Sequence, residues 1–546
     1  MNANDRIFEE ELDRQFSLTP SELGIRGFKQ FRTAQWEAME YVRDGGKRFS
    51  ALCLPTGAGK SLSVIGVGKL QGWKVVALTS TKGLQTQYMN DFEKSGMVDV
   101  RGKANYKCKQ FKFLTCDEGG RQGCACMGSA QCPYSLAVNK ARANRLVVSN
   151  YAYWLHANAS GRGLELPNVE STRVDCLVLD EAHTAAEELS RFLQISISRA
   201  EIEDMLGKDS MPSGDEVADW QRFGQDHARE MKVHAEELGK TLAVQGSLVD
   251  PEMVQYHKQL EILAEKLEKL AGISSNEWVV EKHTDRKNRE YWTADPIWPG
   301  RYAERSLFVG VPHIILLSAT LNRKTLSLLG IKAEDCQFRE WPRIFPANRN
   351  PIYHVPTVKM NFRTTDLEMI QWVKRIDEII DGRMDRKGLI HTVAYHRQQF
   401  LMNHSRHRGI MMGNTSDPDS PNAAEVVRAF KASKSPRVLV SPSFSTGWDF
   451  PGTDAEYQII SKIAFPDSQS KVMKARKARD GGYINYLAMQ DLVQAAGRPS
   501  RSMDDRSETV IVDDNIGWFL FRNRELAPKW FTVRRMASVP KAPPKL

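Results

Sequence analysis

The sequence predicts an α/β protein with two parallel-sheet domains and two insertions in the first of them. Three observations support this fold class: a recurring strand–loop–helix pattern, a basic segment rich in cysteine, and a long segment with helical leucine spacing. At 546 residues the chain is too long for a single hydrophobic core, so about three or four folding units are expected.

The strand–loop–helix pattern consists of short apolar runs, each followed by a polar or glycine-containing loop. Runs buried on both faces are typical of parallel strands, and ligands of parallel sheets bind beyond the carboxyl ends of the strands. The loops after these runs are therefore the predicted binding region. The runs are residues 50–54, 75–78, 176–179, 314–317, 388–390 and 437–440.

Residues 101–150 contain the first predicted insertion. Nine Lys and Arg side chains stand against two acidic ones there, and five of the eight cysteines fall within it. Clustered cysteines in a chain without a signal peptide favour a metal site over disulfides. The clustered residues are Cys108, Cys116, Cys124, Cys126 and Cys132, whereas Cys53, Cys176 and Cys336 stand alone in apolar surroundings and are predicted to be buried.

Residues 185–305 form the second predicted insertion and are expected to be mainly helical. Leu260, Leu263, Leu267 and Leu270 recur there at helical spacing among Glu and Lys side chains. This stripe predicts packing between two helices rather than a binding surface.

Charge and hydropathy limit the partners and the location. The net charge is +9, but between residues 201 and 270 acidic side chains outnumber basic ones 16 to 8, so the remainder is strongly basic. A basic surface suits a polyanionic partner such as nucleic acid, and a solvated surface with surplus cations is the simpler alternative. No apolar run approaches the roughly 20 residues that cross a bilayer, and the N-terminus lacks a signal peptide's apolar segment. We therefore expect a cytoplasmic location and no membrane partner.

A phosphate-binding loop is predicted after the first apolar run. Gly57 and Gly59 let backbone N–H groups approach phosphate oxygens at the start of a helix. Lys60 would reach the β- and γ-phosphates of ATP, and Ser61 would ligate Mg²⁺. The loop lacks the leading glycine of the common pattern, so a plain glycine-rich turn is the alternative. The predicted nucleotide-binding residues are Thr56, Gly57, Ala58, Gly59, Lys60 and Ser61.

Asp180 and Glu181 follow the apolar run at residues 176–179. Asp180 can hold Mg²⁺, and Glu181 can orient and deprotonate the attacking water. An acidic pair at a strand end is often only a stabilised helix start, but together with Lys60 it predicts a nucleotide-hydrolysing site. The Asp-Glu-Ala-His box at residues 180–183 and the Pro-Thr-Gly-Ala-Gly-Lys-Ser loop resemble those of superfamily-two helicases.

Such helicases clamp one nucleotide between two sheet domains, and the resemblance extends to the second. Gln494, Arg498 and Arg501 lie in a Gln-x-x-Gly-Arg-x-x-Arg segment. Two arginines spaced three residues apart on a helix point to one side and would stabilise the developing phosphate charge. A surface helix with solvated arginines is the alternative. Residues 318–321, Ser-Ala-Thr-Leu, resemble the coupling motif of these helicases.

Two further segments resemble nucleotide-binding motifs of the same superfamily. Asp449 lies in Ser-Thr-Gly-Trp-Asp-Phe-Pro-Gly, where Thr446 replaces the usual Glu. Arg32 and Gln35 resemble an adenine-binding Q motif, although a plain helix start fits the same residues. All three side chains, Arg32, Gln35 and Asp449, are predicted to bind the nucleotide.

The cysteine cluster lies between the loop at residues 79–82 and the Asp-Glu-Ala-His box, which narrows the resemblance to the XPD/DinG family. Members of that family have two RecA-like motor domains, with an iron–sulfur domain and then a helical arch inserted in the first. The implied organisation is motor domain 1 at residues 1–100, 148–184 and 306–335, a cysteine module at 101–147, the arch at 185–305, and motor domain 2 at 336–546.

The resemblance implies a [4Fe–4S] cluster as a cofactor in addition to ATP and Mg²⁺. The predicted ligands are Cys108, Cys116, Cys126 and Cys132, and Cys124 is close enough to replace Cys126. A zinc site is one alternative, because four cysteines suit either metal. A module that keeps its fold without metal is another.

Basic residues among aromatic ones suit contact with single-stranded DNA. One candidate for this contact is the run at Lys471–Arg479, which is basic but has no aromatic residue. The other candidate is the cysteine module, which has both kinds of residue: Lys103, Lys107, Lys109, Lys112 and Arg121 beside Tyr106, Phe111, Phe113 and Tyr134. Tyr106 is expected to pack inside the module.

The resemblance implies an ATP hydrolase that moves 5′→3′ along single-stranded DNA and unwinds forked duplex DNA as a monomeric motor. The main alternative is a nucleic-acid-stimulated translocase that remodels complexes without unwinding, such as a DinG-like subunit of a CRISPR-associated nucleoprotein complex. A P-loop kinase would not need Arg498 and Arg501 in a second sheet domain, and an inactive adaptor would not need Lys60 and Glu181.

Overall fold

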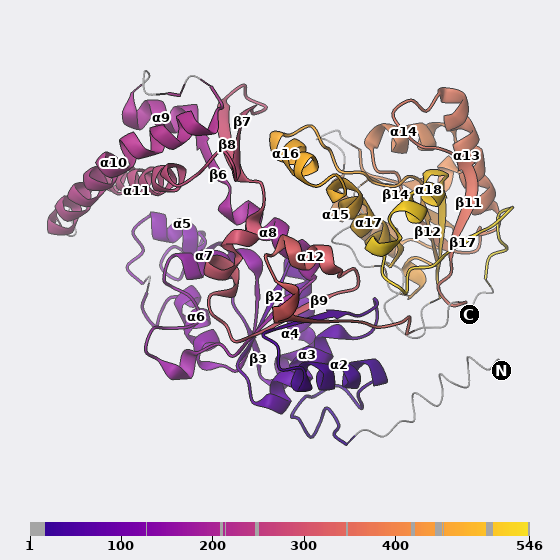
Figure 1. Ribbon diagram of the computed structural model, residues 1–546, viewed down its shortest axis with the longest axis horizontal. Coiled ribbons are helices and arrows are strands. Elements are labelled where there is room, and N and C mark those ends of the chain that lie inside the picture. Colours follow the sequence, from indigo (N-terminus) through magenta and orange to yellow (C-terminus); the bar gives the residue numbers. More distant parts are fainter. Residues whose placement is uncertain are drawn as a thin grey trace.

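A computed structural model describes residues 17–126, 128–207, 211–212, 214–245, 250–344, 348–415, 421–442, 450, 452–497 and 506–543. Two seven-stranded sheets and one three-stranded sheet form within these residues. In Figure 1 the first seven-stranded sheet lies in the lower part of the view, the second lies at the right, and a long helical hairpin projects at the upper left. The predicted fold class, two parallel α/β domains with insertions in the first, is confirmed.

The first domain is an all-parallel sheet in the order β10-β1-β9-β5-β2-β4-β3. Helices cover both faces, so alternate side chains of one strand enter different cores. In β1, Ala51 packs into one core and Leu52 into the other. The strands are β1 (Phe49–Cys53), β2 (Val75–Thr79), β3 (Met97–Asp99), β4 (Leu146–Asn150), β5 (Cys176–Asp180), β9 (His313–Ser318) and β10 (Cys336–Glu340). The helices are α2 (Thr33–Asp44), α3 (Lys60–Gln71), α4 (Lys82–Phe92), α6 (Pro133–Ala143), α7 (Tyr151–Ala159) and α12 (Arg323–Leu328).

Strand β10 corrects the predicted domain boundary. It pairs with β1, and Trp341 after it is buried in a core of the first domain. The first domain therefore extends past residue 335, where the prediction ended it. Every residue of β10 is only half-buried, because it lies at the sheet edge, so it lacks the continuous apolar run that marked the other strands.

The second domain is also all-parallel, in the order β13-β14-β12-β15-β16-β11-β17. Its strands are β11 (Ile352–Val358), β12 (Lys387–His391), β13 (Met411–Met412), β14 (Arg437–Ser441), β15 (Tyr457–Ile460), β16 (Glu508–Asp513) and β17 (Val533–Arg535). Its helices are α13 (Asp366–Asp381), α14 (Tyr395–His404), α15 (Ala423–Ala432), α16 (Lys471–Arg479), α17 (Tyr483–Ala496) and α18 (Asn515–Arg522).

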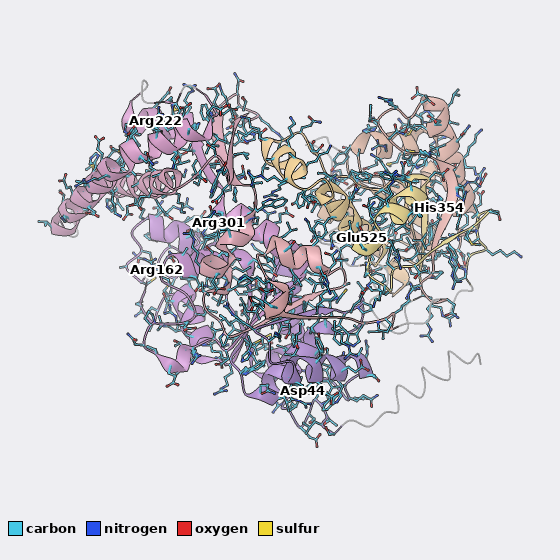
Figure 2. The ribbon with its side chains drawn as sticks, viewed as in Figure 1. Asp44, Arg162, Arg222, Arg301, His354 and Glu525 are labelled. Atoms are coloured by element: carbon cyan, nitrogen blue, oxygen red, sulfur yellow. The ribbon has the colours of Figure 1, made fainter. Side chains whose placement is uncertain are left out.

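The arch contains the predicted helix pair. The four stripe leucines are fully or almost fully buried between α10 and α11, and burying one leucine stabilises a fold by about 1.5–3 kcal/mol. Gly224 allows close approach, because an added Cβ would lie 2.4 Å from the backbone nitrogen of Ala271. In Figure 2, Arg222 marks the hairpin and Arg301 marks its root. The helices are α8 (Ala185–Leu193), α9 (Arg199–Leu206), α10 (Val217–Gln245) and α11 (Pro251–Ala271).

The arch also holds an antiparallel sheet in the order β6-β8-β7 that the sequence did not predict. Its strands are β6 (Ile195–Ser198), β7 (Trp278–Thr284) and β8 (Glu290–Pro296). The expectation of a mainly helical segment is therefore incomplete. In β7 only Trp278 and Val280 are buried, with the half-buried Val279 between them, which gives too short an apolar pattern to separate from the helical stripe before it.

The cysteine module has little regular structure. Its helix α5 (Cys116–Arg121) is short and begins with a capping box, in which the hydroxyl of Thr115 accepts from the N–H of Glu118. Lys258 on α11 donates to the carbonyl of Gly120 at 3.1 Å, so the hairpin contacts the module. None of the helices in the described ranges has the length and hydropathy of a membrane span.

Candidate active site

The glycine loop has the geometry of an anion site. Gly57 and Gly59 adopt positive φ angles of 77° and 72°, which favour glycine because no Cβ is present. Helix α3 begins at Lys60 directly after the loop. The N–H groups of a helix start are free to bind phosphate oxygens. The predicted loop residues, from Thr56 to Ser61, therefore surround a position suited to phosphate.

Arg32 and Gln35 brace this loop from α2. Arg32 Nη1 donates to the carbonyl of Gly57 at 2.6 Å, and the buried amide of Gln35 donates to the carbonyl of Ala58 at 2.9 Å. A Cβ added at Gly59 would lie 2.2 Å from Gln35 Nε2, so the loop closes tightly over this amide. Contact of Arg32 and Gln35 with an adenine base stays a prediction.

Asp180 and Glu181 lie at the carboxyl end of β5. Asp180 is 7% exposed; burial and the neighbouring Glu181 raise its pKa to about 6, while Lys60 opposes this rise. A buried carboxylate of this kind gains from a bound cation. Glu181 has φ 49°, a left-handed conformation that costs a non-glycine residue about 1–3 kcal/mol and is typical of functional sites.

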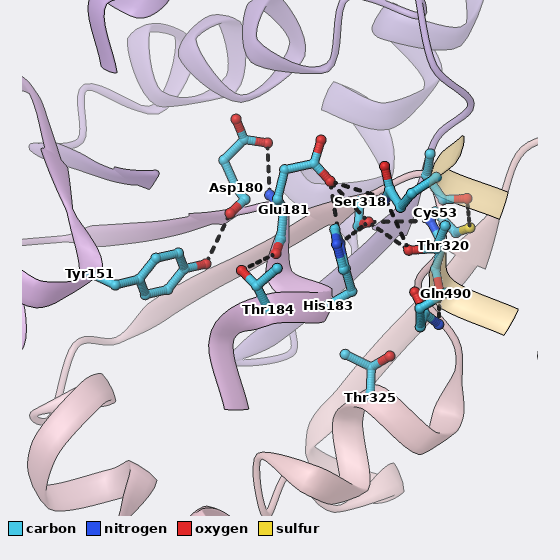
Figure 3. Close-up of polar contacts among 12 residues, drawn as sticks. Cys53, Tyr151, Asp180, Glu181, His183, Thr184, Ser318, Thr320, Thr325 and Gln490 are labelled. Carbon is cyan, nitrogen blue, oxygen red and sulfur yellow. Dashed lines mark hydrogen bonds and ion pairs between the residues drawn. The ribbon is translucent and has the colours of Figure 1, made fainter. Parts of the chain in front are cut away.

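The Glu181 carboxylate is held by neighbours from the same domain (Figure 3). Ser318 Oγ donates to Glu181 Oε2 at 3.3 Å and lies 2.8 Å from His183 Nδ1. His183 Nδ1 is itself 3.3 Å from Glu181 Oε2. Ser318 Oγ is also 3.1 Å from Thr320 Oγ1. The Ser-Ala-Thr segment therefore connects directly to the predicted catalytic base.

Helix α17 of the second domain reaches the same carboxylate. Gln494 Nε2 donates to Glu181 Oε2 at 3.4 Å and to Thr320 Oγ1 at 3.3 Å. One turn earlier, Gln490 Nε2 donates to the carbonyl of Thr320 at 2.9 Å. A Cβ at Gly497 would lie 2.9 Å from Thr56 Cγ2, so the end of α17 abuts the glycine loop.

The structure brings together Lys60, Asp180, Glu181 and Gln494 from the predicted catalytic set. Arg498, Arg501 and Asp449 lie outside the described residues. The sequence prediction had not included Gln490, although its position four residues before Gln494 on one helix was a usable signal.

The cysteine module gathers its thiols in a small space. Cys124 Sγ lies 2.9 Å from Cys126 Sγ and 3.5 Å from Cys108 Sγ, and these three sulfur atoms fall within 4.8 Å of one another. The sequence prediction took Cys126 as a ligand and Cys124 only as its possible replacement. In the structure, the sulfur atoms of both residues lie close to that of Cys108. Cys116 and Cys132 are buried, and burial together with the neighbouring Cys132 raises the pKa of Cys116 to about 11.

A groove of about 440 Å³ lies between the cysteine module and the first domain. Lys103 Nζ lies 5.8 Å from the ring centre of Tyr134. Tyr106 stacks edge-on against Tyr134 and accepts from the N–H of Arg101, so it belongs to the module's packing, as expected. Phe113, in contrast, is fully exposed. The groove is lined in part by Lys82, Lys103, Tyr134, His156 and Arg162.

The basic run on α16 does not form one free strand-contact surface, contrary to the prediction. Arg476 is buried and donates to the carbonyl of Ile297. Lys471 forms an ion pair with Asp215, and Arg479 donates to the carbonyl of Asn276. These cations are engaged by the arch and its root because α16 packs against β7.

Two family models match separate parts of the chain. Residues 28–207 match the model described as the res subunit of type III restriction enzymes. Residues 383–533 match the model described as a helicase C-terminal domain. Among curated proteins, none matches the sequence significantly.

Solved XPD structures share the fold over nearly the whole chain. One XPD helicase aligns with a TM-score of 0.60 at 15% identity, over 93% of this chain and 100% of its own. An Xpd protein from S. tokodaii aligns with a TM-score of 0.56 at 15% identity, over 93% and 100%. An apo XPD structure aligns with a TM-score of 0.53 at 14% identity, over 92% and 99%. At these identities the likeness concerns the arrangement of the domains and their insertions.

Proposed function

We propose that this chain is a superfamily-two helicase of the XPD/DinG type, an ATP-dependent DNA helicase that moves 5′→3′ on single-stranded DNA and unwinds duplex DNA. The observation that carries the proposal is the pair of hydrogen bonds from Gln494 to Glu181 and Thr320. A side chain of the second domain thereby touches the predicted base of the first, so hydrolysis and domain movement are physically linked. The polarity rests on family resemblance alone.

In this proposal the two domains share one ATP. Lys60 and the glycine-loop N–H groups bind the β- and γ-phosphates, and Ser61 and Asp180 hold Mg²⁺. Glu181 orients and deprotonates the attacking water. From their sequence motif, Arg498 and Arg501 are proposed to stabilise the developing phosphate charge.

Single-stranded DNA is the proposed substrate because cationic and aromatic side chains occur together in two places. The first is the groove beside the cysteine module. The second lies on the second domain, where the buried Asp513 carboxylate accepts from the N–H groups of Met360, Ile463 and Asn515 and so joins three loops at one edge of the sheet. Cationic grooves with stacking faces follow a nucleic-acid strand without needing its sequence. Arg363 lies over the ring of Phe362, and Arg522 lies over the ring of Trp518. The exposed aromatic side chains near those loops are Phe362, Phe465, Trp518 and Phe521.

The cysteine module is proposed to bind a [4Fe–4S] cluster. The donor set fits, because five thiols lie in one short segment and three sulfur atoms already converge. Cys108, Cys126 and Cys132 are proposed ligands, and the fourth comes from Cys124 or Cys116. When bound, the cluster would cross-link the segments that carry these cysteines.

Strand displacement on partial duplexes tests the function. We expect the protein to release the duplex strand from a 5′-tailed substrate with ATP, and not from a 3′-tailed one. Lys60→Ala should remove the activity, because the phosphates lose their cation. ATP hydrolysis indifferent to single-stranded DNA would contradict the proposal. DNA-stimulated hydrolysis without strand release would indicate a remodelling translocase instead.

A further inference from the structure

Arg476 lies where the second domain, the arch and the helix after Glu181 meet. It belongs to α16 of the second domain and is 8% exposed. Its Nε donates to the carbonyl of Ile297 at 2.7 Å, and its Nη2 donates to Ser190 Oγ at 2.8 Å and to the carbonyl of Pro296 at 3.1 Å. Its Nη1 donates to the hydroxyl of Tyr483 at 3.3 Å. One guanidinium is therefore bonded to four groups.

These four acceptors come from three parts of the molecule. Ser190 lies on α8, which begins four residues after Glu181. Pro296 and Ile297 lie at the end of β8, where the chain leaves the arch. Tyr483 opens α17, the helix that carries Gln494. Arg476 thus connects the exit of the arch, the helix after the catalytic base, and the helix that reaches that base from the second domain.

Breaking the hydrogen bonds of Arg476 costs free energy, because its guanidinium is buried. Within the described residues it forms no ion pair, and it lies 5.9 Å from the ring centre of Trp298. A buried cation without a carboxylate depends on its hydrogen bonds, and the rigid fork of a guanidinium suits several acceptors at once. When nucleotide binding moves α17 against the first domain, Arg476 therefore carries that displacement to β8 instead of releasing it.

Other contacts of α16 continue this link into the arch sheet. The backbone N–H of Lys471 donates to Glu281 Oε2 on β7 at 3.0 Å, and its side chain pairs with Asp215 at 2.5 Å. The other end of the arch reaches the cysteine module through Lys258 and the carbonyl of Gly120. A displacement of the arch root thus changes the placement of the hairpin against the module.

We propose that Arg476 is a positioning residue that couples the nucleotide state to the arch, a role that rests on the proposed helicase function. ATP hydrolysis itself does not require Arg476, because no reacting group touches it. Unwinding requires it, because the arch must change its position over the cysteine module once for each nucleotide cycle.

The first test compares Arg476→Lys with Lys374→Gln, an exposed cation on α13 of the same domain that serves as control. Arg476→Lys keeps the charge but loses the planar, branched donor group. We expect its DNA-stimulated ATP hydrolysis to stay within about twofold of the wild type, and the base pairs unwound per ATP to fall about tenfold. Lys374→Gln should change neither. A parallel fall of hydrolysis and unwinding, or an unchanged ratio, would overturn the coupling role. If Arg476→Lys lowers the melting temperature, Ser190→Ala, which removes one acceptor, should still lower the same ratio.

The second test needs nucleotide binding but no unwinding, so its failure is distinct from failure of the proposed function. Fluorophores attached through unnatural amino acids at Glu236 on the hairpin and Gln122 in the module report their separation. In the otherwise wild-type chain, a non-hydrolysable ATP analogue should change the energy transfer between them. In Arg476→Lys this change should disappear while the analogue still binds. An equal change in both proteins would exclude the proposal.

Discussion

The nucleotide site and the cysteine module are both marked by short residue patterns, but the protein holds them in different ways. Three side chains, His183, Ser318 and Gln494, meet the Glu181 carboxylate. In the module, the half-buried Cys124 and Cys126 mainly contact other sulfur atoms. The protein thus prearranges the predicted nucleotide site with its own hydrogen bonds, whereas in our proposal a bound cluster fixes the loops of the module.

The largest expected effect tests the catalytic half of this comparison. Glu181→Gln should lower ATP turnover about 10³-fold, because the attacking water loses its base. ATP affinity should stay unchanged, because the glycine loop is intact. Steady-state hydrolysis and binding of a fluorescent ATP analogue measure the two quantities. The control is Glu187→Gln, an exposed carboxylate that pairs with Arg191. Comparable turnover in the two variants would remove Glu181 from the role of base.

A smaller effect is expected from the contact between the domains. Gln494→Ala should lower kcat roughly tenfold and leave KM nearly unchanged, because His183 and Ser318 still hold Glu181. Asn485→Ala on the same helix serves as control, because its amide donates to Asn523 within the second domain. If both variants hydrolyse ATP equally well, the second domain does not support the catalytic base.

The same comparison explains which parts of the molecule could be predicted from sequence. Continuous apolar runs identified the buried central strands, because parallel strands covered on both faces need them. The edge strand β10 was assigned to the wrong domain because its side chains are only half-buried. The small sheet of the arch was missed because its strands follow a strong helical stripe.

Candidate site residues could be predicted from sequence only where a local pattern marks them. Lys60, Asp180 and Glu181 could be predicted as candidates because phosphate chemistry requires particular residue types at strand ends, and the structure brings these three residues together. Gln490 acts mainly through geometry between distant segments, which no local pattern records. The engagement of Arg476 and Lys471 by the arch was likewise invisible in a run of basic residues, since a charge pattern does not reveal which partner faces it.

Removing a thiol tests the other half of the comparison. Cys126→Ser should lower the absorbance near about 400 nm in anaerobically purified protein. It should also speed proteolysis within residues 101–147 several-fold, at roughly constant ATP affinity, because in our proposal the metal holds the module and not the glycine loop. Cys336→Ser, on the half-buried strand β10, is the matched control. If proteolysis of the module is equally slow in both variants and in the metal-free wild type, protein contacts alone hold the module together.

The smallest expected effect separates the surface of the module from its packing. Phe113 is fully exposed, so Phe113→Ala should leave proteolysis and ATP hydrolysis unchanged but lower unwinding about threefold, since one stacking face for a separated base is lost. Phe111 is half-buried beside Cys108, whose sulfur accepts from its N–H. Phe111→Ala should therefore loosen the module itself and increase its proteolysis. Unwinding on forked DNA and limited proteolysis, measured for both variants, distinguish the two roles. If Phe113→Ala unwinds DNA as fast as the wild type, the exposed ring has no part in strand separation. The groove at Tyr134 is then the remaining candidate for contact between the module and DNA.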